Sequence, residues 1–171
     1  MKTFKSAILI LMIGLAVTSC KKDDDGGGDG GAASGTITAN VSGVGDFSST
    51  TQLTSGTTQT ANGVSVLQLT GSDNNGRNIT IVINGYDGTG SYDIGGSNSV
   101  FVIATYVEAN ASDPQNSQIW TAPFDTSVAG EINISEATAS NVKGTFNFEG
   151  KNNNDQSMKS ITGGSFDINL Q

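Results

Sequence analysis

Apolar and polar residues alternate along most of the chain after residue 35. Such alternation places one side chain in a core and the next in water, which is typical of strands in antiparallel sheets. The clearest examples are 36–41, 78–83, 131–135, 142–149 and 165–170. After residue 20, no window longer than eight residues has the 3.6-residue period of a helix, so we expect no substantial helix.

Two apolar segments depart from simple alternation. In 64–69 the apolar positions change face between Val66 and Leu67, which predicts a β-bulge at that point. Residues 100–107 are apolar on both faces. This pattern predicts a central strand, or one covered on its second face by a loop, and the alternative is a strand that borders a ligand cavity.

Clusters of Asn, Asp, Gly and Ser separate the alternating segments. They lie at 72–76, 87–90, 95–98 and 152–155. Asn and Gly tolerate positive φ, and Asn and Asp side chains close turns through their own hydrogen bonds. The sequence therefore predicts an all-β fold: an antiparallel meander of about nine strands that forms a β-sandwich or a partly closed barrel.

The first 19 residues have the features of a secretory signal peptide. Two lysines precede an apolar run over 7–17, and this run is shorter than a helix needs to span a bilayer. Residues 17–20, Val-Thr-Ser-Cys, resemble a bacterial lipobox. The resemblance implies that Cys20 is lipidated and becomes the new N-terminus, and its acyl chains would anchor the protein to a membrane.

Residues 20–35 follow as an acidic, Gly-rich segment that has no apolar surface to bury. We expect a flexible tether, and the 14 residues of 21–34 would span about 20 Å. Its Lys-then-Asp order after the cysteine resembles the export signal of Bacteroidota lipoproteins. That resemblance implies an outer-membrane, lipid-anchored protein facing the cell surface. The expected organisation is a signal peptide at 1–19, lipidated Cys20 with its tether at 20–35, and one all-β domain at 36–171.

Composition excludes several kinds of chemistry. The chain has no His and a single Cys, so a His-based triad, a His/Cys zinc site, a haem histidine and a disulfide framework are excluded. Removal of 1–19 takes away two lysines and no acid, which leaves a net charge of −10. Nucleic-acid binding is not expected, because neutralising phosphates requires a basic face.

Catalysis is also not expected. Carboxylates are numerous, but the strand pattern marks no pair as buried and convergent, and no Ser-x-x-Lys motif stands at the start of a predicted helix. Asp/Asn clusters at 73–76 and 153–155 could supply oxygens to calcium, yet hairpin turns account for them. We therefore predict no enzyme activity, no cofactor and no metal, and a carboxylate-dependent hydrolase is the weakest alternative.

Ligand binding is the specific activity that the sequence favours. Exposed aromatic rings stack on sugars, and amide side chains bond to sugar hydroxyls, so Trp120, Tyr106 and Gln118 are the candidate site residues. Gln118 and Trp120 would share a strand face opposite Ile119. The main alternative is a lipocalin-like barrel that carries a small apolar ligand in a pocket lined by Phe101, Ile103 and Tyr106.

The strand at 142–148 (Val-Lys-Gly-Thr-Phe-Asn-Phe) and the ending at 161–170 carry a family resemblance. With the spacing of the other strands, they resemble a family of uncharacterised Bacteroidota surface lipoproteins over most of 36–171. This resemblance implies a β domain of unknown function and a surface location. It implies no activity and no site residues.

Overall fold

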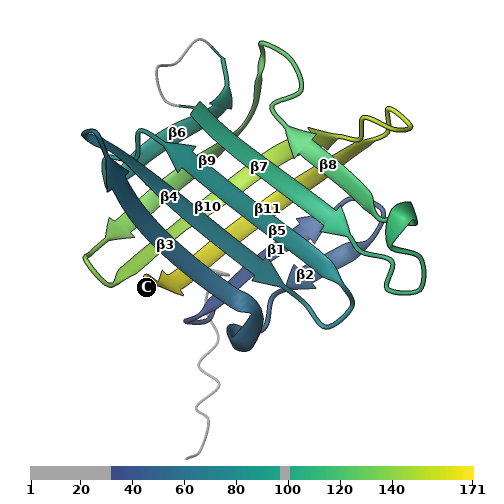
Figure 1. The fold of residues 1–171 in the computed structure, drawn as a ribbon, viewed down its shortest axis with the longest axis horizontal. Helices are drawn as coiled ribbons and strands as arrows, with labels where there is room; N and C mark the ends of the chain where they lie inside the picture. Colours follow the sequence, from purple (N-terminus) through teal and green to yellow (C-terminus); the bar gives the residue numbers. More distant parts are fainter. Residues whose placement is uncertain (1–31, 97–100) are drawn as a thin grey trace, which may run out of the picture.

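The computed structural model describes residues 32–96 and 101–171, and these residues form an all-β fold (Figure 1). Its strands are β1 (Thr36–Val41), β2 (Gly45–Ser48), β3 (Thr54–Ala61), β4 (Val64–Ser72), β5 (Arg77–Asn84), β6 (Gly90–Gly95), β7 (Phe101–Glu108), β8 (Gln118–Ala122), β9 (Val128–Ala137), β10 (Asn141–Lys151) and β11 (Met158–Asn169). The only helical elements described are two three-residue 3-10 turns, η1 (Thr51–Leu53) and η2 (Pro114–Asn116). The all-β prediction is confirmed, with two strands more than expected.

The strands form one antiparallel sheet that curls back on itself. Its order is β2-β1-β11-β10-β8-β7-β5-β4-β3, with β9 paired to β10 and β6 paired to β9. At the far end β3 returns to β11, where Gly56 forms an isolated bridge to Leu170 and Gln171 N donates to Gly56 O at 3.0 Å. Of the two predicted architectures, the partly closed barrel is the one observed (Figure 1).

Alternation along each strand builds the interior. In β5, for example, Ile79, Ile81 and Ile83 are fully buried, and the residues between them face outward. Aromatic rings fill the side formed by β10 and β11, where Phe146 lies 6.3 Å from Phe166 between ring centroids. Burial of apolar side chains is the main stabilising term, so this inward set determines which face of every strand is left for function.

The predicted bulge at Val66 is wrong. Strand β4 pairs with both β3 and β5 without a register shift from one end to the other. Leu67 and Leu69 point inward, whereas Val64 and Val66 lie on the outer face. The apolar residues therefore change face because valines occupy outward positions, and no extra residue is inserted.

The two-faced apolar segment is the central strand that the sequence predicted. Strand β7 lies between β5 and β8. Its residues Val102, Ala104 and Tyr106 are buried inside the barrel, and Phe101 is 57 % exposed on the outside.

The chain enters the barrel beside the end of β11. Gly35 N donates to Asp167 O at 2.6 Å just before β1 begins. The predicted signal peptide and Cys20 lie outside the described residues. Among the residues that are described, no helix is long and apolar enough to cross a membrane.

Candidate functional site

The structure brings the predicted site residues together, but inside the barrel. Tyr106 on β7 is paired with Trp120 on β8, and their ring centroids are 5.8 Å apart. Tyr106 is fully buried and Trp120 is 5 % exposed. On the same side of β8, the half-buried Gln118 accepts a hydrogen bond from Asn152 Nδ2 at 2.7 Å. The exposed position expected for Trp120 is wrong, because Ile119 takes the outward phase of this strand and Trp120 the inward one. A ligand-binding role for the three residues stays a prediction.

A partly buried lysine completes this cluster. Lys159 Nζ lies 4.1 Å from the centroid of the Trp120 ring and forms an ion pair with Glu108. Tyr106 Oη donates to the same Glu108 carboxylate at 3.1 Å, and Trp120 Nε1 donates to Ser157 Oγ at 3.0 Å. Burial and the neighbouring Glu108 carboxylate both raise the pKa of Tyr106, so its hydroxyl stays a proton donor. The polar groups satisfy one another, and the arrangement ties β7, β8 and β11 together.

A second charged pair closes the β4–β5 turn nearby. Arg77 Nε lies 2.6 Å from Asp73 Oδ2, and the Asp73 side chain is only 5 % exposed. Desolvation raises the pKa of Asp73. Hydrogen bonds from Arg77 and Asn75 together outweigh this effect, so the net shift of the pKa is downward. The carboxylate oxygens accept the backbone N–H groups of Asn75 and Arg77, which is the arrangement expected of a hairpin turn. No group of three or more potential metal ligands occurs among the described residues.

The pocket expected for an apolar carrier is not formed by the residues named for it. Phe101 and Ile103 face out of the barrel, whereas Tyr106 faces in, because positions of odd separation along a strand lie on opposite faces. These three side chains therefore cannot line one cavity.

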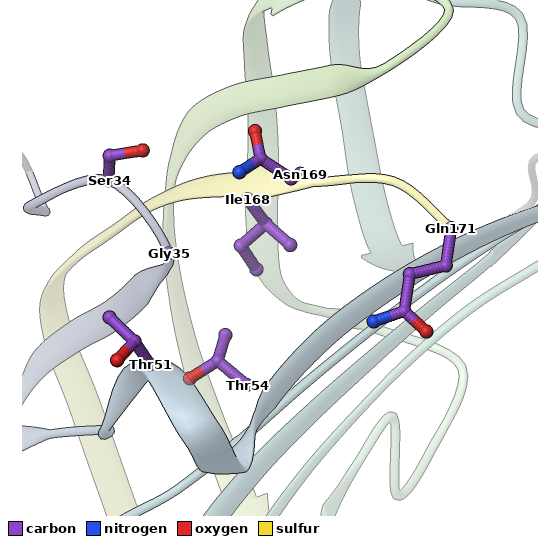
Figure 2. A pocket seen from close by; sticks show the side chains of 7 residues that line it. All are labelled: Ser34, Gly35, Thr51, Thr54, Ile168, Asn169 and Gln171. Atoms are coloured by element: carbon purple, nitrogen blue, oxygen red, sulfur yellow. The ribbon is translucent and has the colours of Figure 1, made fainter.

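Surface depressions occur where the chain enters the barrel. One of about 280 Å³ lies between η1, the start of β1 and the end of β11, and in Figure 2 Ile168 points into it toward Thr51 and Thr54. Another of about 320 Å³ lies over β9, β10 and β11, where Lys143 is 3.4 Å from Asp167. Neither is lined by Tyr106, Gln118 or Trp120.

The most distinctive surface is the outer face of β3, β4, β5, β7 and β8, which we call the neutral face. It is one continuous set of cross-strand neighbours, and none of its residues is charged. Its members are Ser55, Thr57, Gln59, Ala61, Val64, Val66, Gln68, Thr70, Ser72, Asn78, Thr80, Val82, Asn84, Phe101, Ile103, Thr105, Val107, Ile119 and Thr121. The outer side of β6, β9, β10 and β11 instead carries Asp93, Glu131, Glu136, Lys143, Glu149, Lys151 and Asp167.

Hydroxyl side chains run across the middle of the neutral face. Pairing register aligns Ser55, Thr70, Thr80, Thr105 and Thr121 in one row over five strands. The hydroxyls of Thr70 and Thr80 are 2.9 Å apart and hydrogen-bonded. Apolar side chains flank this row.

Sequence reasoning missed both the neutral face and the partly buried Lys159–Glu108 pair. Each outward Thr or Val looks like an ordinary solvent-facing position in its own strand. Only the strand order shows that these positions are neighbours. The one available signal for the ion pair was the small number of basic residues after the tether, because each of them has many possible acidic partners.

Together, these features define a small, partly closed β-barrel domain with a buried aromatic pair, a partly buried ion pair beside it and one charge-free outer face. The chain belongs to the family described as a domain of unknown function (DUF6252), whose model matches residues 36–168. No curated protein and no solved structure matches the chain. The family match confirms a domain of unknown function, and the resemblance to Bacteroidota lipoproteins stays a prediction.

Proposed function

We propose that the protein is a lipoprotein anchored in the outer membrane and displayed at the cell surface, with a non-catalytic β domain. The domain binds an uncharged glycan or another uncharged extracellular ligand on its neutral face. The neutral face is the observation that carries this proposal. In a chain with 16 acidic and 8 basic residues, a five-stranded surface without charge is a marked departure from the rest.

The chemistry of the neutral face favours an uncharged ligand. The neutral face has no charged group that could form an ion pair with a charged ligand, and the acidic remainder of the protein repels anions. Hydroxyl and amide groups on the face can donate and accept hydrogen bonds. Phe101, Val64 and Ile119 are about half exposed and supply apolar contact beside them. A sugar chain presents hydroxyls and apolar ring faces, so it meets both kinds of surface.

The position of the chain entry supports anchored display. Residues 32–35 reach the barrel beside the end of β11, so an anchor at Cys20 would hold the domain by that end (Figure 1). A tether that spans about 20 Å leaves the domain room to stand clear of lipid headgroups.

Localisation depends on Cys20 in this proposal. We expect the wild-type protein in the outer-membrane fraction, digested by protease added to intact cells. Cys20→Ser removes the sulfur that would carry lipid, so the variant should move to the soluble fraction. Ser34→Ala, which leaves Cys20 in place, is the matched control. A Cys20→Ser protein that stays membrane-bound and shielded from protease would contradict the lipoprotein assignment.

Binding depends on the neutral face. Thr105→Glu places a charge at the centre of the hydroxyl row. We expect it to weaken binding to uncharged polysaccharides on a glycan array by about tenfold or more, equivalent to about 1.4 kcal/mol. Thr145→Glu adds the same charge to the exposed outer side of β10 and should bind like wild type. Equal binding by both variants, with unchanged melting temperatures, would place the ligand elsewhere.

A further inference from the structure

Strand β3 has one edge that the described chain leaves largely unpaired. On one side it pairs with β4 from Thr54 to Ala61. On the other side, the one bridge formed by the described residues joins Gly56 to Leu170, just past the end of β11. Beyond Gly56, residues 58–61 are exposed on both faces, so the β3–β4 hairpin projects from the barrel (Figure 1).

The backbone groups at this edge can be assigned to individual residues. Gly56 O accepts from Gln171 N, so Gly56 directs its backbone polar groups away from β4. Backbone groups alternate in direction along a strand, so Thr58 and Thr60 point the same way as Gly56. Thr57 and Gln59 bond to β4 instead. The edge therefore presents the free N–H and C=O groups of Thr58 and Thr60.

Nothing in the sequence of β3 protects this edge. Proteins commonly block an exposed edge with a lysine, a proline, a bulge or an inward charge. Residues 54–61 contain no charge and no proline, and the β3–β4 register shows no bulge. An edge in this condition is a template for another strand.

Charge favours a second copy of this chain as that strand. Two copies each carry a net charge of −8 over the full sequence, so they repel each other where charged surfaces meet. The β3 edge and the adjoining neutral face carry no charge, and two copies can approach there without apposing like charges. The strand is also compatible with itself, because the pairs it would form are uncharged Thr–Thr, Gln–Gln and Thr–Ala pairs.

We propose that β3 pairs antiparallel with β3 of a second copy, about a two-fold axis at Gln59. The register follows from which residues of the β3 edge are unpaired. Gly56 O is occupied, and Asn62, at φ 52°, begins the hairpin turn, so only 57–61 remain, and Gln59 is their centre. Thr58 bonds to Thr60 of the second copy, and Gln59 faces Gln59 of the second copy in a non-hydrogen-bonded pair. About four backbone hydrogen bonds form, two for each hydrogen-bonded pair.

The dimer has a consequence for the surface beside it. A two-fold axis perpendicular to the sheet keeps both neutral faces on the same side, so they join into one larger charge-free surface. This inference does not depend on a ligand or on the anchor.

A single cysteine tests the register. Directly opposite residues of a non-hydrogen-bonded pair have Cα atoms about 4.5 Å apart, within the range that a disulfide spans. In the full chain carrying Cys20→Ser, the introduced cysteine is the only thiol. We expect Gln59→Cys to form a disulfide-linked dimer under mild oxidation, measured on a non-reducing gel. Thr57→Cys is the matched control: it points to the same face of the same strand but opposes Ala61 of the second copy, so it should cross-link at least about tenfold less.

A second variant tests the hydrogen bonds. Thr58→Pro, added to Gln59→Cys, removes an edge N–H that β4 does not use, and we expect the cross-link to fall about tenfold while the melting temperature changes little. Equal cross-linking of Gln59→Cys and Thr57→Cys, or none from Gln59→Cys, would overturn the dimer. Because this background lacks Cys20, failure here leaves the localisation and binding tests of the proposed function unaffected.

Discussion

Gly144→Val is expected to destabilise the barrel by about 3 kcal/mol or more, which is a large fraction of the stability of a typical domain. Gly144 lies on β10 between β9 and β11, with Phe166 as its cross-strand neighbour. A Cβ atom there would lie 2.1 Å from Asn133 O and 2.6 Å from Phe166 Cζ. The phenyl ring can turn, but the Asn133 carbonyl belongs to the β9 backbone and can move only with its strand. A glycine is required here because the β9 backbone at Asn133 and the Phe166 ring both approach this position too closely to leave room for a Cβ atom.

Urea unfolding, followed by tryptophan fluorescence, measures this effect. Thr145→Val is the control because it changes the next residue of the same strand on its exposed outer side, and it should shift stability by no more than about 0.5 kcal/mol. A Gly144→Val midpoint close to that of Thr145→Val would show that β10 and β9 separate easily at this point.

Alternation predicted the inside and outside of the strands well because it is a local property. The three isoleucines of β5 determine their own phase, whatever strand lies beside them. The failure at Val66 has a physical cause: on a half-exposed outer face, valine is tolerated and favoured by its β-branched shape. An outward valine and a bulge give the same sequence pattern, and only the pairing register separates them.

Only part of the candidate site could be predicted from the sequence. Tyr106 and Trp120 could be placed together, because successive strands of a meander pair. Lys159 is 51 residues from Glu108 and reaches it only because β10 and β11 return to β8 and β7. The phase of Trp120 was also undetermined, because Ile119 and Trp120 are adjacent apolar residues of a short strand and either can face inward.

Because Trp120 is buried, we expect its substitution to affect mainly the stability of the fold. Trp120→Ala should lower the free energy of unfolding by about 3–5 kcal/mol, the range for removing a large buried aromatic side chain. The loss has three parts: the apolar contact with Tyr106, the hydrogen bond to Ser157, and the ring face that lies under Lys159 Nζ. The last part leaves the partly buried Lys159 ammonium group with Glu108 and the more distant Tyr106 ring as its remaining partners.

Trp120→Phe separates these contributions, because it keeps a ring under Lys159 and removes only the Nε1 donor and part of the volume. We expect about 1–2 kcal/mol for this variant. Ile119→Ala, the outward neighbour on β8, is the control and should cost less than about 1 kcal/mol, measured by circular dichroism in urea. If Trp120→Ala proves as stable as Ile119→Ala but loses glycan binding, the Trp120 ring contacts the ligand directly and becomes exposed in solution to do so. If stability falls and the folded fraction binds as before, the ring is part of the core, and any ligand is held on the outer side of the sheet.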